Sequence, residues 1–104
     1  MKKFARIVGT GSYLPPRIIT NSELEKSLDT TDEWITSRTG IKERRVVDNQ
    51  STCDLALEAS KKALEMAEIK ASEIDLIILA TTTPDKTFPA TATTLQDRIG
   101  ALCP

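Results

Sequence analysis

The chain has 104 residues, of which 39% are hydrophobic and 28% are charged, so its length suits one small domain or part of a larger one. Fourteen Lys and Arg against fifteen Asp and Glu leave a formal net charge of −1. This balance argues against nucleic acid or an anionic membrane as a partner, because both need a basic face. The chain contains no histidine, which excludes imidazole-dependent catalysis and the common zinc sites within these residues.

The cysteines and the apolar stretches indicate the compartment. Cys53 and Cys103 are too far apart in sequence for a CxxC metal site, and two cysteines make no disulfide framework, so we expect reduced thiols. No targeting segment is evident, and the longest charge-free apolar stretch, Leu76–Ala80, is too short to cross a bilayer. We therefore expect a cytoplasmic protein.

The chain is predicted to open with a strand and a tight turn. Phe4–Val8 is mostly apolar and β-branched, and it is followed by Gly9 and Gly11. A dinucleotide-binding loop would need a third glycine at position 14, which is Leu14, and a long helix after it. The glycines are therefore interpreted as a turn.

Two short helices are expected next. Thr20 and Glu23 have the spacing of a capping box, which predicts a helix over Ser22–Leu28. The same spacing recurs from Thr30 onward, so a second helix is expected to begin there and to end at Gly40, a residue that favours a helix C-terminus.

The second half of the chain alternates between strand and helix patterns. Lys42–Val47 is predicted to be a strand near a sheet edge, and Thr52–Glu68 to be a long helix. Ile74–Ala80 has six apolar residues in seven, which is typical of a strand covered on both faces. Thr91–Ile99 is predicted to be the final helix.

The long helix is predicted to have one solvated face and one alanine-lined face. Its charged residues recur at steps of three and four, as in an amphipathic helix. Alanines on the opposite face would let the helix approach a sheet or another helix closely. The charged face comprises Asp54, Glu58, Lys61, Glu65 and Glu68, and the opposite face comprises Ala56, Ala59, Ala63, Met66 and Ala67.

This alternation of strands and helices predicts an α/β fold. A sheet buried on both faces needs more strands than the roughly three expected here. Residues 1–104 are therefore expected to be the N-terminal part of a larger α/β protein rather than a complete domain.

Several residues are candidates for chemistry. Trp34 and Arg38 are four apart on a predicted helix and share a face, so they could hold an adenine ring and its phosphates, or form a cation–π or packing pair. Phe88 lies in a proline-bracketed loop after an apolar segment, where a binding role and a packing role are equally compatible with the sequence.

Other candidates have simpler explanations. The acidic residues Asp29, Asp32 and Glu33 suit a helix N-terminus better than a metal site. Cys103 lacks a base to activate it and is interpreted as a small buried hydrophobe, and Cys53 is likewise interpreted as structural.

Taken together, the motifs resemble those of one family of condensing enzymes, the 3-oxoacyl-[acyl-carrier-protein] synthase III family. The resemblance is to the N-terminal third of the enzyme and covers essentially the whole chain. The matching segments are Gly9-Thr10-Gly11-Ser12-Tyr13-Leu14-Pro15, Thr20-Asn21, Asp32-Glu33-Trp34-Ile35, Arg38-Thr39-Gly40-Ile41, Glu43-Arg44, Ala80-Thr81-Thr82-Thr83 and Phe88-Pro89-Ala90.

The resemblance implies the thiolase fold, a layered αβαβα sandwich of two similar halves, with residues 1–104 in the first half. It implies that a homodimer condenses an acyl-CoA primer, most simply acetyl-CoA, with malonyl-acyl carrier protein through an acyl-cysteine, using no cofactor and no metal. The cysteine, histidine and asparagine of the family would lie beyond Pro104. The chain alone is therefore expected to be inactive.

The resemblance also implies roles for four residues. Trp34 matches the residue that stacks on the adenine of CoA, with Thr30 and Arg38 as its polar neighbours. Phe88 matches the residue that reaches across the dimer and limits the partner's acyl pocket.

Two alternatives remain open at this stage. One is a relative of the same fold that makes a specialised metabolite, such as an alkyl quinolone or a polyketide starter. The other is a non-catalytic CoA-binding or interaction module.

Overall fold

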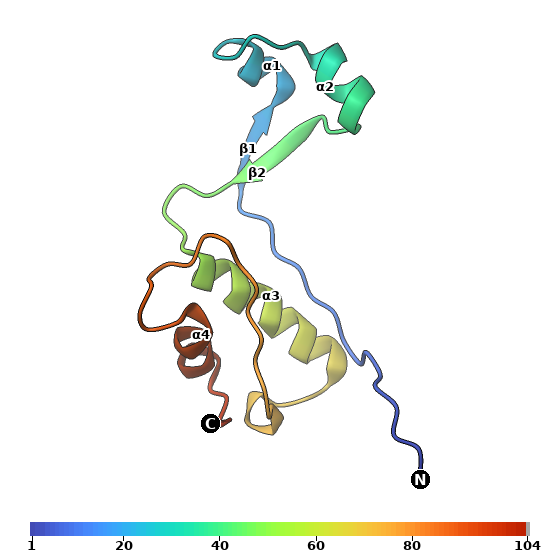
Figure 1. Cartoon of the computed structure of the whole chain (residues 1–104), viewed down its shortest axis with the longest axis vertical. Helices are drawn as coiled ribbons and strands as arrows, with labels where there is room; N and C mark the ends of the chain where they lie inside the picture. Colours follow the sequence, from blue (N-terminus) through green and yellow to red (C-terminus); the bar gives the residue numbers. More distant parts are fainter. Residues whose placement is uncertain (104) are drawn as a thin grey trace. The chain divides into compact units, whose positions relative to one another are not determined.

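The computed structural model describes residues 1–103, which form two compact units (Figure 1). One unit consists of residues 1–13 together with residues 50–103, and the other is Leu14–Asn49. Among the described residues, no helix combines the length and the apolar character that a membrane span requires.

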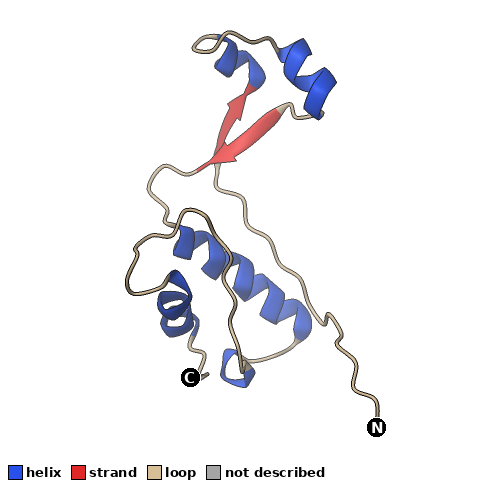
Figure 2. Ribbon diagram, viewed as in Figure 1, coloured by secondary structure: helices blue, strands red, loops and turns tan. Residues whose placement is uncertain are grey.

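The Leu14–Asn49 unit contains a two-stranded antiparallel sheet and two helices (Figure 2). Strand β1 (Arg17–Thr20) pairs with β2 (Glu43–Val46), and helices α1 (Asn21–Glu25) and α2 (Asp32–Thr39) lie between them in sequence. Strand β2 confirms the strand predicted over residues 42–47. Strand β1 was not predicted, because its short sequence lacks an alternating apolar pattern.

The ends of these two helices are set by local side chains. The Thr20 hydroxyl accepts a hydrogen bond from the Glu23 N–H, which confirms the predicted cap, although α1 ends at Glu25 rather than Leu28. Helix α2 ends at Gly40, as predicted, and this glycine has the left-handed φ of 70°. Its first turn is capped by Thr31, one residue later than predicted, through a 3.1 Å bond from the Trp34 N–H.

The other unit is built around two packed helices, α3 (Thr52–Ala67) and α4 (Thr91–Ile99), joined through the short 3₁₀ turn η1 (Ala71–Glu73) and an extended segment. Both helices confirm the sequence prediction. Leu57 of α3 and Leu95 of α4 meet in a small core, together with Cys53.

Glycines bring the N-terminal segment very close to α3. An added Cβ at Gly9 would lie 2.5 Å from the carbonyl oxygen of Ala63, and one at Gly11 would lie 2.2 Å from that of Ala59. The helix is therefore approached closely on its alanine-lined side, but by an extended N-terminal segment rather than by the sheet or helix that was predicted. Met66 was wrongly assigned to the buried face: it is 63% exposed, and its sulfur accepts a hydrogen bond from the Thr10 N–H.

The two predicted apolar strands do not form. Residues 4–8 and 74–80 are assigned to no strand, because the only ladder within the described residues joins β1 to β2. In the second segment, Ile77 and Leu79 pack against the core, whereas Leu76 is 73% exposed and Ile78 is 83% exposed. The prediction of burial on both faces is therefore wrong for this structure, in which only one face of the segment is covered.

Candidate functional site

Helix α2 carries the two residues predicted to hold a nucleotide. The Cζ atom of Arg38 lies 4.9 Å from the centre of the Trp34 ring, which is within the range of a cation–π interaction. The predicted shared face is therefore confirmed. Trp34 remains 54% exposed, so the indole retains surface that a ligand can cover.

A pocket of about 750 Å³ borders this indole. Its wall combines apolar side chains with a few polar groups, which is the usual composition of a small-molecule site. Arg38 is not part of the wall, so of the three residues predicted to bind CoA the pocket unites Thr30 and Trp34. The pocket is lined by Leu24, Leu28, Asp29, Thr30, Thr31, Trp34, Ile35, Thr39, Ile41 and Arg44.

Thr30 was predicted to begin helix α2, but it does not cap this helix. Thr31 caps α2, and the Oγ1 atom of Thr30 is buried without a hydrogen-bond partner among the described residues. A buried hydroxyl in this condition carries a desolvation penalty that a ligand group can remove. The correction therefore leaves Thr30 available to the pocket.

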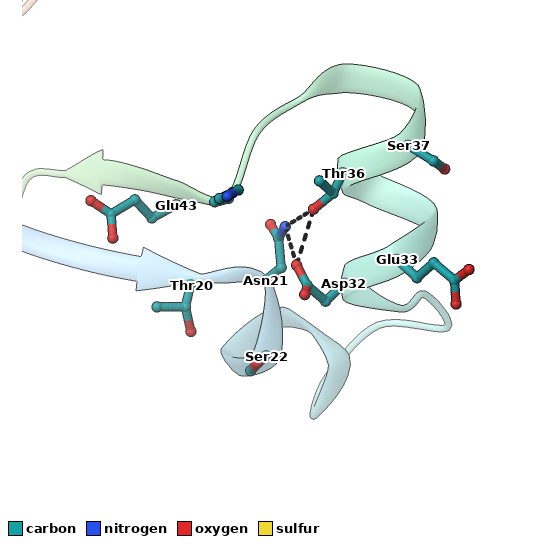
Figure 3. Close-up of a pocket in the computed structure, with 9 residues that line it drawn as sticks. Thr20, Asn21, Ser22, Asp32, Glu33, Thr36, Ser37 and Glu43 are labelled. Carbon is teal, nitrogen blue, oxygen red and sulfur yellow. Dashed lines mark hydrogen bonds between the residues drawn. The ribbon is translucent and has the colours of Figure 1, made fainter.

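Sequence reasoning missed a buried polar hub next to this pocket. Asn21 is only 1% exposed, and its Nδ2 lies 2.7 Å from Oδ1 of Asp32 and 3.3 Å from Oγ1 of Thr36 (Figure 3). The same nitrogen donates to the Ile41 carbonyl oxygen at 2.7 Å, and the Asn21 Oδ1 accepts from Nη2 of Arg44 at 2.9 Å. One side chain thus ties α1 to α2 and to β2.

A second hollow of about 590 Å³ borders this hub, and Figure 3 shows the residues that line it. It is lined by short polar and charged side chains, including Asp32, which was weighed as a metal ligand from the sequence. Here Asp32 accepts hydrogen bonds from Asn21 and from the Thr36 hydroxyl, so its carboxylate serves the local hydrogen-bond network.

Phe88 lies in the other unit, on the loop between the extended segment and α4. It is 85% exposed, and the loop is anchored three residues earlier by Asp85. The Asp85 carboxylate accepts hydrogen bonds from the N–H groups of Thr52, at 2.7 Å, and Cys53, at 2.9 Å, in the first turn of α3. Phe88 is thus presented to the outside from a tethered loop.

These bonds also affect the protonation of the anchor. The pKa of Asp85 lies below its ordinary value, and the largest cause is the hydrogen bond from the Cys53 N–H. Desolvation raises the pKa, and the hydrogen bond from the Thr52 N–H lowers it further. The carboxylate is therefore favoured in the form that the helix N-terminus attracts.

Cys53 and Cys103 are both free thiols and both buried, which agrees with their interpretation as structural residues. Cys53 is 1% exposed and Cys103 is 7% exposed.

Comparison with known proteins gives a consistent result, although no family model matches the chain. A curated relative, the β-ketoacyl-[acyl-carrier-protein] synthase III of Vesicomyosocius okutanii, is 65% identical over 104 residues, which is 100% of this chain and 33% of the relative. The chain thus spans about a third of the length of the curated relatives it matches.

Solved structures agree with the sequence match. The 3-oxoacyl-[acyl-carrier-protein] synthase III of Aquifex aeolicus is 52% identical, with a TM-score of 0.88 over 90% of this chain and 30% of that one. The priming β-ketosynthase of a polyketide biosynthetic pathway is 35% identical, also with a TM-score of 0.88, over 92% of this chain and 30% of that one.

These matches confirm the resemblance to the synthase III family that the motifs indicated. They also confirm the predicted fold class: the chain is part of an α/β fold of the thiolase type.

Proposed function

We propose that this chain is the N-terminal third of a 3-oxoacyl-[acyl-carrier-protein] synthase III, the condensing enzyme that initiates type II fatty-acid synthesis. The observation that supports this best is the 65% identity to a curated synthase III, which extends over the entire chain. Residues 1–104 would belong to the first of the two thiolase-like halves.

The proposed reaction joins an acyl-CoA, most simply acetyl-CoA, to malonyl-acyl carrier protein. A cysteine thiolate attacks the carbonyl carbon of the primer thioester, CoA leaves as its thiolate, and the acyl group remains on the cysteine. Loss of CO2 from the malonyl group supplies the carbon nucleophile that attacks this acyl group and releases the cysteine. The cysteine and its histidine and asparagine partners are proposed to lie outside residues 1–104, which contain no histidine.

The contribution of this chain is proposed to be the binding of the primer's nucleotide. The half-exposed indole of Trp34 would stack on adenine, with Thr30 and Arg38 as polar partners. The pocket of about 750 Å³ beside the indole supports this role. For the ring to be covered on both faces, adenine would take the face that Arg38 leaves free.

Phe88 is proposed to act in the partner's acyl pocket of a homodimer. Its 85% exposure on a loop tethered by Asp85 supports a role outside its own core. A cytoplasmic location is part of the proposal, because two free cysteines suit a reducing compartment. CoA thioester is a substrate here, and no cofactor or metal is invoked.

The decisive experiment is a condensation assay of the full-length protein with acetyl-CoA and malonyl-acyl carrier protein, following 3-oxoacyl-acyl carrier protein by mass spectrometry. Formation of that product supports the proposal. Absence of condensation with every short acyl-CoA tested would overturn it.

A second candidate is a synthase that primes a specialised metabolite. It is favoured by the 35% identity to a polyketide priming ketosynthase with the same TM-score as the synthase III of Aquifex aeolicus. The same assay separates a synthase III from a specialised synthase. A specialised enzyme would prefer another acyl acceptor to the malonyl-acyl carrier protein of fatty-acid synthesis.

A further inference from the structure

We propose that Arg44 binds a phosphate group of the ligand in the pocket at Trp34, and that Asn21 positions the Arg44 guanidinium for this task. The inference rests on the proposed function for the identity of the ligand, a CoA thioester. It adds Arg44 to the predicted set of Thr30, Trp34 and Arg38; the sequence places Arg44 in a matching motif but predicts no role for it.

The first argument is that Arg44 is held but not neutralised. Its Nη2 donates to the Oδ1 atom of Asn21 at 2.9 Å, so within residues 1–103 the side-chain partner of Arg44 is a neutral amide. The ion pairs among the described residues are Arg17–Asp48, Lys61–Glu58 and Arg98–Asp54, and Arg44 takes part in none of them. A guanidinium fixed by an amide keeps its full charge for an anionic partner.

The second argument is the state of the other guanidinium nitrogen. Nη1 of Arg44 is buried, and it has no hydrogen-bond partner within residues 1–103. A buried donor without an acceptor is costly, and the cost is greater for a charged group. An acceptor oxygen supplied by a ligand would remove this cost.

The third argument is that the two unpartnered groups line one pocket. In the described part of the chain, the buried side-chain polar atoms without partners are Nη1 of Arg44 and Oγ1 of Thr30, and both residues line the pocket that Trp34 borders. A hydroxyl and a guanidinium beside an aromatic ring match a ligand that carries both a flat base and phosphate oxygens.

The fourth argument concerns the rigidity of the arrangement. Asn21 is 1% exposed and also bonds Asp32 on α2 and the Ile41 carbonyl before β2. The guanidinium is therefore fixed relative to the helix that carries Trp34, which lowers the entropy cost of binding. Asn21 acts through Arg44 and is a positioning residue.

The experiment compares Arg44→Gln with Arg45→Gln in the full-length protein. Arg45 is the neighbouring residue of β2 and donates to the Pro15 carbonyl oxygen at 3.2 Å, and it does not line the pocket. The control variant thus removes the same charge one residue away. Both variants are assayed with acetyl-CoA and with acetyl-pantetheine, a primer that has no nucleotide or diphosphate.

We expect Arg44→Gln to raise the KM for acetyl-CoA by about tenfold to a hundredfold, the effect of losing a hydrogen bond to a charged group. Its kcat at saturating acetyl-CoA and its KM for acetyl-pantetheine should stay close to wild type. Arg45→Gln should match wild type with both primers. Asn21→Asp should raise the KM for acetyl-CoA, because a carboxylate neutralises the guanidinium.

Unchanged KM values for Arg44→Gln would overturn the inference, and so would an equal rise with both primers, which is the signature of a structural role. If the wild-type protein condensed nothing, the proposed function would fail by itself. Calorimetric titration of the same variants with CoA would then decide the inference: weaker binding to Arg44→Gln alone supports it, and equal binding or no binding to wild type overturns it.

Discussion

The carboxylate of Asp85 lies 2.9 Å from the backbone nitrogen of Cys53 and caps the first turn of a helix more than thirty residues earlier in the chain. The same carboxylate also accepts a hydrogen bond from the N–H of Thr52, so both of its oxygens bind the first turn of the helix. Through this contact the loop that presents Phe88 is tied to α3, so the position of the ring depends on a group remote from it in sequence.

The first prediction concerns acid stability. Because the pKa of Asp85 lies below its ordinary value of 3.8 in the folded chain, its stabilising contribution is fully present above that value and is lost as the pH falls through the folded pKa. Asp85→Asn should therefore lower the free energy of unfolding at neutral pH, and its deficit should shrink in acid. Urea titrations of both proteins from about pH 7 to about pH 3 measure this. The exposed Asp75→Asn serves as the control, and a deficit that is independent of pH would contradict the prediction.

The second prediction concerns the glycines packed on α3. Gly11→Ala should destabilise the protein by about 1–3 kcal/mol, because its Cβ would meet the Ala59 carbonyl oxygen. Thermal melts of the variant and of Thr10→Ala, whose side chain is exposed, give the comparison. Equal melting temperatures for Gly11→Ala and wild type would show that the segment is not held against the helix.

The third prediction tests the indole. Trp34→Ala should raise the KM for acetyl-CoA by roughly tenfold, the loss expected when base stacking is removed, with a smaller effect on kcat. Trp34→Phe retains an aromatic face, so its KM for acetyl-CoA should lie between those of wild type and Trp34→Ala. Steady-state kinetics with acetyl-CoA as the varied substrate measure this, and an unchanged KM would return Trp34 to a packing role.

The fourth prediction tests Phe88. Replacing it by alanine in the full-length dimer should shift the preference from acetyl-CoA toward longer primers, because a rigid ring blocks a tunnel sterically, whereas each methylene is worth only about 1–3 kcal/mol by binding. Competition between acyl-CoA primers of increasing length, with analytical ultracentrifugation for the dimer, gives the readout. A chain-length profile and a dimer dissociation constant that both match wild type would assign Phe88 to ordinary packing.

The fifth prediction concerns the isolated 104-residue chain. Large apolar side chains are widely exposed, with Phe4 and Ile7 at 85%, Ile78 at 83% and Leu102 at 79%. We expect this chain to aggregate or to melt without cooperativity, since extended apolar surface promotes association. Calorimetry and amide spectra measure the cooperativity of unfolding. A sharp cooperative transition would favour the hypothesis that the chain is a self-sufficient module.

The helices could be predicted from the sequence because their signals are local. The cap at Thr20, the left-handed end at Gly40 and the periodicity of α3 all arise within a few residues. The cap at Thr31 was misplaced by one residue, because two adjacent threonines offer the same hydroxyl and only the backbone decides which one is used.

The strands and the polar hub could not be predicted in this way. Residues 74–80 have strand-like composition, but a ladder needs a partner that composition does not specify. Asn21 and Arg44 fall within sequence motifs, but nothing in the motifs indicates that the two side chains meet. An asparagine directly after a capping threonine was the available signal, yet its burial depends on α2 and β2 folding around it.

The pair of glycines on α3 also determines which residues of the N-terminal segment face the helix. Only residues without a Cβ fit against the carbonyl oxygens of Ala59 and Ala63. Sliding the segment by one residue would press Thr10 and either Val8 or Ser12 onto those oxygens. The alternating glycines therefore fix the position of the segment along the helix. A single residue inserted between Gly9 and Gly11 would abolish that alignment, although the composition of the segment would hardly change.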